Sequence, residues 1–442
     1  MRHFLLTLAI FAFGLIEPSA AQERRFSTGI AGSNAPDSHD RTRYYFDMPA
    51  VRQLLQRLES GPLNRQDIEE QLAGSNATVE DLLRTSVVAE HEGRFIIGFN
   101  YYTLEDIRLV RRIVAQHTPS LVAAYERERP ALRRALDRYN VRSVDKDVLA
   151  YVLIAGIGLN WDGLRFTQEA GYRRPLLVTG SNFSYSFWAT ERDPEASTRG
   201  WIWGSSSAPL EFRNLTPPID YSFTSYGDPD SYVVRRMNLP DLLFFSRDEM
   251  HPPIQTLADR IGYTDEDVLG IQLQQVIGFG VGRSLGEILF ALRSGPKSTN
   301  TLAEHVRPED QPRLGALLDL LEEIQYVRRD RRGRYELLIP VFDHQDLAMT
   351  EEVLAINRRV LNAWTAEHIP IMEREMSGIT VLRQGLTFDA AFTQIWHEIF
   401  GLATYQLTQA SYIADAYAAD RRYPGSYGMV WRHAVYPGFR PS

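Results

Sequence analysis

The chain has 442 residues, of which 44% are hydrophobic and 24% are charged, so it can bury a core without help from metals or disulfides. It contains no cysteine, which excludes disulfides, thiolate metal sites and cysteine nucleophiles. The formal net charge of -8 means that the molecule as a whole does not attract polyanions such as nucleic acids.

The first 21 residues have the pattern of a secretory signal peptide. Arg2 precedes an apolar stretch from Phe4 to Ile16, and Ser19 and Ala21 supply the small residues of a cleavage site. We therefore expect cleavage before Gln22 and a mature protein that is periplasmic or secreted, with no transmembrane segment. Residues 22–44 are mostly polar and are expected to be flexible.

Two stretches of the chain are similar enough to predict an internal duplication. Ser-Gly-Pro occurs at 60–62 and again at 294–296, and the apolar residues around it keep the same offset of 234. Gly-Arg-aromatic occurs at 93–95 and at 333–335, and this offset of 240 holds as far as Pro130 and Pro370. Because similarity at a fixed offset indicates repeated structural units, we expect one repeat at 45–174 and a second at 251–442.

Each repeat has the same order of local signals. A helix ends at Ser-Gly-Pro, a short capped helix and a longer helix follow, two short strands flank a glycine, and a long helix comes next. The capping residues are Asn64 and Ser298, the longer helices are expected at 79–89 and 314–326, and the long helices start near Thr103 and Asp346. This order resembles the winged helix-turn-helix domains of small bacterial repressors, at 48–100 and 284–341. The resemblance implies a fold and does not by itself imply a function.

The segment between the repeats has a different composition. Residues 175–250 are rich in Trp, Tyr, Phe, Ser and Pro, and residues 181–188 alternate polar and aromatic side chains, as a half-buried strand does. The tail at 427–431 is a candidate for a shortened counterpart of this segment. We therefore predict a mainly α (α+β) protein: a tandem duplication of a winged-helix-like module plus a helical segment, with a small aromatic-rich β insertion.

The charge pattern argues against DNA binding by the modules. The helix that would enter the major groove needs Lys and Arg, yet residues 75–91 sum to -2 and residues 308–327 sum to -4. The contrary feature is the second wing, which contains Arg328, Arg329, Arg331 and Arg332. Nucleic acid is thus an unlikely partner, although a regulator that contacts nucleic acid through this wing is one alternative function.

A second alternative is a secreted hydrolase. His397 and Glu398 are adjacent and could act as an acid/base pair, with Asp162 from the equivalent helix of the first repeat as a third candidate. A zinc-protease helix would need a second histidine at position 401, which is Gly. Glycine-rich stretches at 156–158 and 278–282 lie in apolar, helical contexts and indicate close helix packing rather than a nucleotide site. We expect no metal and no cofactor.

The aromatic insertion is the most suggestive feature for binding. Trp201, Trp203, Tyr221 and Tyr226 lie among polar residues, and exposed aromatic side chains suit stacking on sugars or packing against a partner. If these residues face inward instead, they form the core of a small sheet. Our first hypothesis is an exported, non-catalytic binding or assembly protein whose partner is a protein or polysaccharide of the cell envelope.

Overall fold

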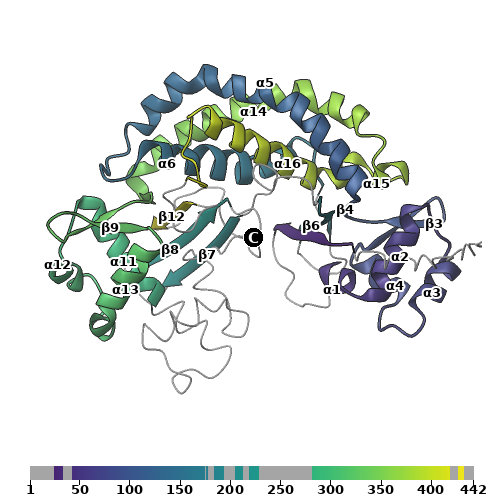
Figure 1. Ribbon diagram of the computed structural model, residues 1–442, viewed down its shortest axis with the longest axis horizontal. Coiled ribbons are helices and arrows are strands. Elements are labelled where there is room, and N and C mark those ends of the chain that lie inside the picture. The colour runs from purple at the N-terminus through teal and green to yellow at the C-terminus, as the bar shows by residue number, and fades with distance from the viewer. Residues whose placement is uncertain are drawn as a thin grey trace, which may run out of the picture.

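The protein is mainly helical, with small sheets. The computed structural model describes residues 24–32, 42–174, 176–177, 184–193, 205–212, 219–227, 281–418 and 427–432. The expected signal peptide at 1–21 lies outside these residues. Long helices form a curved layer, and a small α/β module lies at each end of it (Figure 1).

The first module contains the three expected helices followed by a hairpin, with one short helix before them. Its elements are α1 (Thr42–Phe46), α2 (Pro49–Glu59), α3 (Arg65–Leu72), α4 (Val79–Arg84), β2 (Val88–His91), β3 (Arg94–Ile97) and β4 (Asn100–Tyr102). The expected helices are α2 to α4. Asn64 caps α3 as predicted, through its side chain and the backbone N–H of Asp67. Helix α4 is shorter than the predicted 79–89, because Ser86 adopts a positive φ of 57° and turns the chain toward β2.

The second module repeats this order. It contains α11 (Gly282–Ala291), η6 (Leu292–Ser294), α12 (Thr299–Ala303), η7 (Pro308–Arg313), α13 (Leu314–Glu323), β9 (Val327–Arg329), β10 (Tyr335–Leu337) and β11 (Val341–Phe342). Ser298 caps α12 as predicted. Gly333 supplies the positive φ of 72° that the hairpin turn requires.

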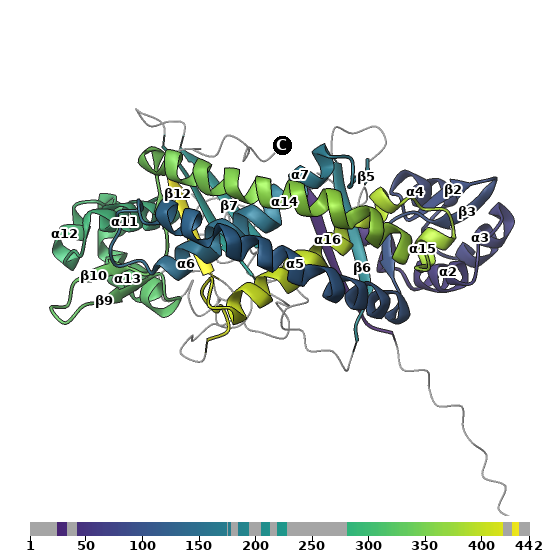
Figure 2. The ribbon, with the colours of Figure 1, turned by 90° about the horizontal axis from the view of Figure 1, so that it is seen from above.

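The central layer contains two long helices that lie side by side, α5 (Leu104–Leu136) and α14 (Leu347–Glu375), the latter preceded by η8 (His344–Asp346) (Figure 2). The other members are α6 (Lys146–Ala150), η2 (Tyr151–Asp162), α7 (Gly163–Glu169), α15 (Thr380–Arg383) and α16 (Phe388–Gln409). The continuous run from α6 to α7 is long and apolar enough to cross a membrane, but 83% of its apolar window is buried inside the protein, as in a core helix.

Strands from the start, the middle and the end of the chain complete the sheets of both modules, so part of the N-terminal segment that we expected to be flexible forms a strand. The first sheet contains β1 (Phe26–Gly32), β5 (Leu176–Leu177), β6 (Ser184–Glu191) and β4, and the second contains β7 (Ser205–Phe212), β8 (Ile219–Tyr226), β12 (Tyr427–Arg432) and β11. β6 pairs in parallel with β4, and β12 pairs in parallel with β11. The described strands of 175–250 therefore divide between two sheets and do not form the separate β insertion that we expected.

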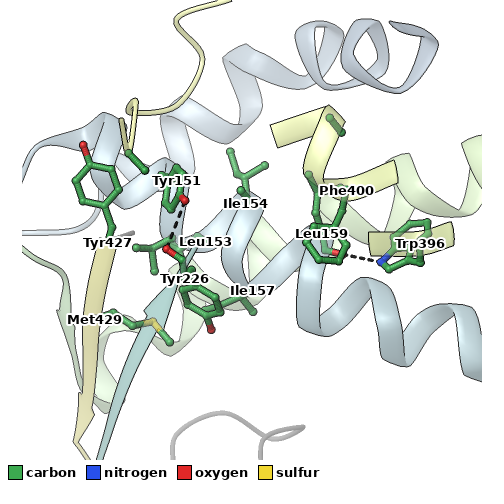
Figure 3. Packing of buried hydrophobic residues seen from close by; sticks show 14 of the residues in the cluster. Tyr151, Leu153, Ile154, Ile157, Leu159, Tyr226, Trp396, Phe400, Tyr427 and Met429 are labelled. Carbon is green, nitrogen blue, oxygen red and sulfur yellow. Dashed lines mark hydrogen bonds between the residues drawn. The ribbon is translucent and has the colours of Figure 1, made fainter. Parts of the chain in front are cut away.

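The described chain divides into a first half, from β1 to β6, and a second half, from β7 to β12. Each half supplies a helix that packs on the sheet of the other half. Helix α16 contacts β4 and β6, and Asn100 of β4 donates a hydrogen bond from Nδ2 to the carbonyl of Ala390 (2.8 Å). Helix η2 contacts β12, and its Tyr151 hydroxyl donates to the carbonyl of Tyr226 on β8 (3.4 Å). Figure 3 shows this packing around η2, including the indole of Trp396, which donates to the carbonyl of Leu159 (3.0 Å).

Candidate functional site

His397 lies inside the protein, on the inner face of α16. It is 8% exposed, and its ring packs between the rings of Trp188 and Phe400, at centroid distances of 4.4 and 5.0 Å. Its Nδ1 lies 2.6 Å from the carbonyl of Thr393, so Nδ1 carries the proton and Nε2 carries a lone pair. Burial, together with nearby Arg173 and against the opposing hydrogen bond to Thr393, lowers the pKa of His397 to about 4, so the ring is neutral at pH 7.

Arg173 is a buried cation beside His397. Its guanidinium donates to the Thr393 hydroxyl (3.0 Å), the Gln168 side chain (2.9 Å) and the Ser186 hydroxyl (3.3 Å), all of which are neutral. No carboxylate pairs with Arg173 among the residues that the structure describes, and burial lowers its pKa to about 10. The Arg173 partners come from α7, β6 and α16, so this network joins the two halves of the chain.

Glu398 faces a different neighbour from His397. Its carboxylate lies 3.0 Å from Nε of Arg111 on α5 and accepts a hydrogen bond from Gln394 (2.9 Å). Burial raises the pKa of Glu398, and Arg111 acts in the opposite direction. Because adjacent helical residues point about 100° apart, His397 and Glu398 contact different elements. The structure does not bring them together as an acid/base pair.

Asp162 is also held by arginines. Its side chain is 1% exposed and accepts two hydrogen bonds from Arg358 of α14, at 2.8 and 2.9 Å, and another from Arg165. The carboxylates of Asp162 and Glu398 thus each join one half of the chain to an arginine on the long helix of the other half. This places both groups in structural ion pairs rather than in one catalytic cluster.

The expectation of an exposed aromatic surface is wrong for two of its four residues. Tyr221 and Tyr226 are 1% and 0% exposed. They lie on β8, between β12 and β7, with Tyr221 against Gly286 of α11 and Tyr226 against Gly156 of η2. Both faces of this strand are covered by helices, so neither face can present aromatic rings to solvent. Trp201 and Trp203 lie outside the described residues.

The arginines of the second wing are partly neutralised by acids of their own module. Arg328 bonds to Glu336 (2.7 Å), and Arg329 bonds to Asp319 (2.7 Å) and Glu322 (3.0 Å). Arg331 and Arg332 are exposed, and neither side chain forms an ion pair within the described part of the chain. Between residues 314 and 337, five arginines face five acids, so the wing is not a strongly positive surface.

Sequence reasoning missed the residues that hold these groups. No local sequence pattern points to the three arginines that hold these groups, because each bonds to a partner on another element, up to 287 residues away. They are Arg111, Arg173 and Arg358. It also missed a polar cluster that forms where α5 meets α14, around His117 and His368. No protein-family model, no curated protein and no solved structure matches this chain.

Proposed function

We propose that this chain is an exported binding or assembly protein, formed by tandem duplication, in which two winged-helix-like modules serve as the scaffold. Equivalent contacts in the two modules support the duplication. Leu63 bridges Phe95 in the first module, and Lys297 bridges Tyr335 in the second, each through backbone bonds of 3.0 and 2.8 Å. The turns also agree: Gly93 and Gly333 have φ values of 73° and 72°.

The observation that carries the functional proposal is the position of the modules. They lie at opposite ends of one helical layer, and the exchange of helices and strands between the halves holds that layer together (Figure 1). Two similar surfaces at a fixed separation suit bivalent binding, because the second contact then becomes intramolecular. A partner in the cell envelope, either protein or polysaccharide, follows from the expected export.

The candidate catalytic residues favour the same conclusion. Glu398 and Asp162 are tied to arginines, and His397 is buried and neutral at pH 7. A general base works best with a pKa near the working pH, which His397 does not have. A role in nucleic-acid contact has less support, because acids of the module neutralise Arg328 and Arg329.

Site-specific photo-cross-linking in the producing cells tests the proposal. A photoreactive residue replaces exposed Glu70 in the first module or exposed Asn300 in the second, and a matched variant carries it at exposed Gln116 on α5. We expect the same envelope partner to be captured from both module positions and not from Gln116. Capture only from Gln116, or from neither module, would overturn the proposal. Binding to a panel of envelope polysaccharides tests the second partner class with the same variants.

A further inference from the structure

A chain of four polar side chains runs across the contact between α5 and α14. Ser120 Oγ lies 2.9 Å from Nε2 of His368, and Nδ1 of His368 lies 3.0 Å from Nδ1 of His117. Nε2 of His117 lies 3.0 Å from a carboxylate oxygen of Glu375. The two histidines are largely buried, with side chains 13% and 14% exposed, whereas Ser120 is exposed.

The proton positions in this chain follow from its carboxylate end. An ionised carboxylate only accepts, so Nε2 of His117 carries a proton, and in a neutral ring Nδ1 is then an acceptor. Nδ1 of His368 must therefore carry the proton between the two rings. This leaves Nε2 of His368 with a lone pair facing Ser120 Oγ at 2.9 Å, within reach of the hydroxyl hydrogen.

A second contact orients the serine. The indole Nε1 of Trp364 donates to Ser120 Oγ at 2.9 Å, which occupies one lone pair of the oxygen. The Ser120 hydroxyl donates to the carbonyl of His117 at 2.7 Å, and rotation about the Cβ–Oγ bond turns the same hydrogen toward Nε2 of His368. Nucleophile, base, orienting histidine and carboxylate thus follow one another as in a catalytic triad with one additional histidine.

We propose that Ser120 is a nucleophile activated by His368, and that it hydrolyses uncharged carboxylic esters. His117 and Glu375 are positioning residues, since they hold the tautomer of His368 and do not touch the substrate. Glu375 and Glu367 lie beside the histidines, with Glu367 at 3.9 Å from Nε2 of His368, so anionic esters are disfavoured. This activity is separate from the binding function proposed above, which makes no use of the cluster.

The reaction balances with water as the only co-reactant. Ser120 Oγ forms a bond to the ester carbonyl carbon as its proton passes to Nε2 of His368. The bond to the leaving alcohol then breaks, and the alcohol oxygen takes that proton. Water then attacks the acyl-serine as Nε2 of His368 takes a proton from it. That proton passes to Ser120 Oγ when the acyl bond breaks, which releases the carboxylic acid and restores the Ser120 hydroxyl.

The protonation of His368 sets the pH dependence. Burial and the neighbouring His117 lower the pKa of His368, and Glu367 raises it. When His368 is protonated, its Nε2 is a donor and can no longer serve as a base. The reaction rate must therefore rise with pH as His368 loses its proton.

A fluorophosphonate probe tests the nucleophile and base directly. Such a probe carries fluoride as its own leaving group, so adduct formation reports on the nucleophile and its base. We expect one adduct by intact mass, mapped to Ser120, and none in Ser120→Ala. His368→Gln should slow adduct formation on the order of 10²-fold, the usual size of a general-base effect. Glu367→Gln should shift the inflection of the pH profile to lower pH, because Glu367 raises the pKa of His368.

Two controls distinguish the activation of Ser120 by His368 from the reactivity of any exposed serine. Ser298 is an exposed serine that caps α12, so any adduct there measures the background. His344→Gln alters an exposed histidine in the second half and should leave the rate unchanged. Hydrolysis of p-nitrophenyl acetate is followed in the same variants. Labelling of Ser120 no faster than Ser298, or unchanged in a folded His368→Gln protein, would overturn the proposal.

Discussion

Replacing Arg111 by Met tests whether the ion pair with Glu398 holds the two halves of the chain together. Arg111 lies on α5 and Glu398 on α16, with 3.0 Å between Nε and the carboxylate and side chains that are 15% and 1% exposed. The substitution leaves a buried carboxylate with only the hydrogen bond from Gln394. Removing one partner of a buried pair costs about 3–5 kcal/mol, so we expect a loss of that size in the free energy of unfolding at pH 7.

The double variant Arg111→Met with Glu398→Gln separates lost charge pairing from lost packing. It should recover most of the stability, because no unpaired charge remains in the interior. The deficit of Arg111→Met should also shrink as the pH is lowered from 7, since burial raises the pKa of Glu398 and a protonated carboxyl needs no cationic partner. Urea unfolding, followed by fluorescence and circular dichroism, measures both effects.

The matched control is Arg112→Met, at an exposed position one residue along α5. It should change stability by less than about 0.5 kcal/mol. If Arg111→Met cost no more than this control, or if the double variant lost as much as the two single changes combined, the ion pair would not be a buried stabilising contact and the reasoning would be refuted.

Three further predictions concern buried residues. His397 should titrate near pH 4 by NMR, and because its pKa lies below that of an unfolded histidine, its own contribution to stability should fall by about 3 kcal/mol as the pH drops from 7 to 4; a midpoint near 6.5 would contradict this. Gly158→Ala should cost about 1–3 kcal/mol because the added methyl overlaps the amide of Asn357, whereas Gly315→Ala, with open space around it, should not destabilise the fold. Tyr226→Ala should cost about 3–5 kcal/mol in urea unfolding, as a core residue does, and a loss under 1 kcal/mol would place it at the surface.

Local signals were the reliable part of the sequence. The caps at Asn64 and Ser298 and the turn glycines at 93 and 333 act within a few residues of their own position, and the structure has them where they were predicted. The predicted close helix packing is confirmed at Gly158, where Asn357 of α14 occupies the space of a side chain, whereas at Gly156 the close neighbour is Tyr226 of strand β8. Residues 278–280 of the other glycine-rich stretch lie outside the described residues.

The aromatic residues show where such reasoning fails. Alternation along a strand predicts one buried face and one exposed face. It cannot predict that β8 becomes an inner strand with α11 on one side and η2 on the other, so Tyr221 and Tyr226 are both buried although they lie on opposite faces. Likewise, His397 and Glu398 are neighbours in sequence, but the helix directs them to Trp188 and to Arg111, which lie in different parts of the core.

The exchange of elements between the halves explains why the centre of the molecule depends on distant contacts. Asn100 and Ala390 bond across 290 residues, and α16 covers β4 and β6 while η2 covers β12. A half that lacked its counterpart would leave one face of its sheet without the helix that buries it, and exposed apolar sheet faces are unstable in water. The stable unit is therefore the pair of halves. The contacts that complete each sheet also set the distance between the two modules, so stability and module spacing have the same physical origin. A variant that loosens the packing of α16 or η2 should therefore weaken the binding of any partner that must contact both modules at once.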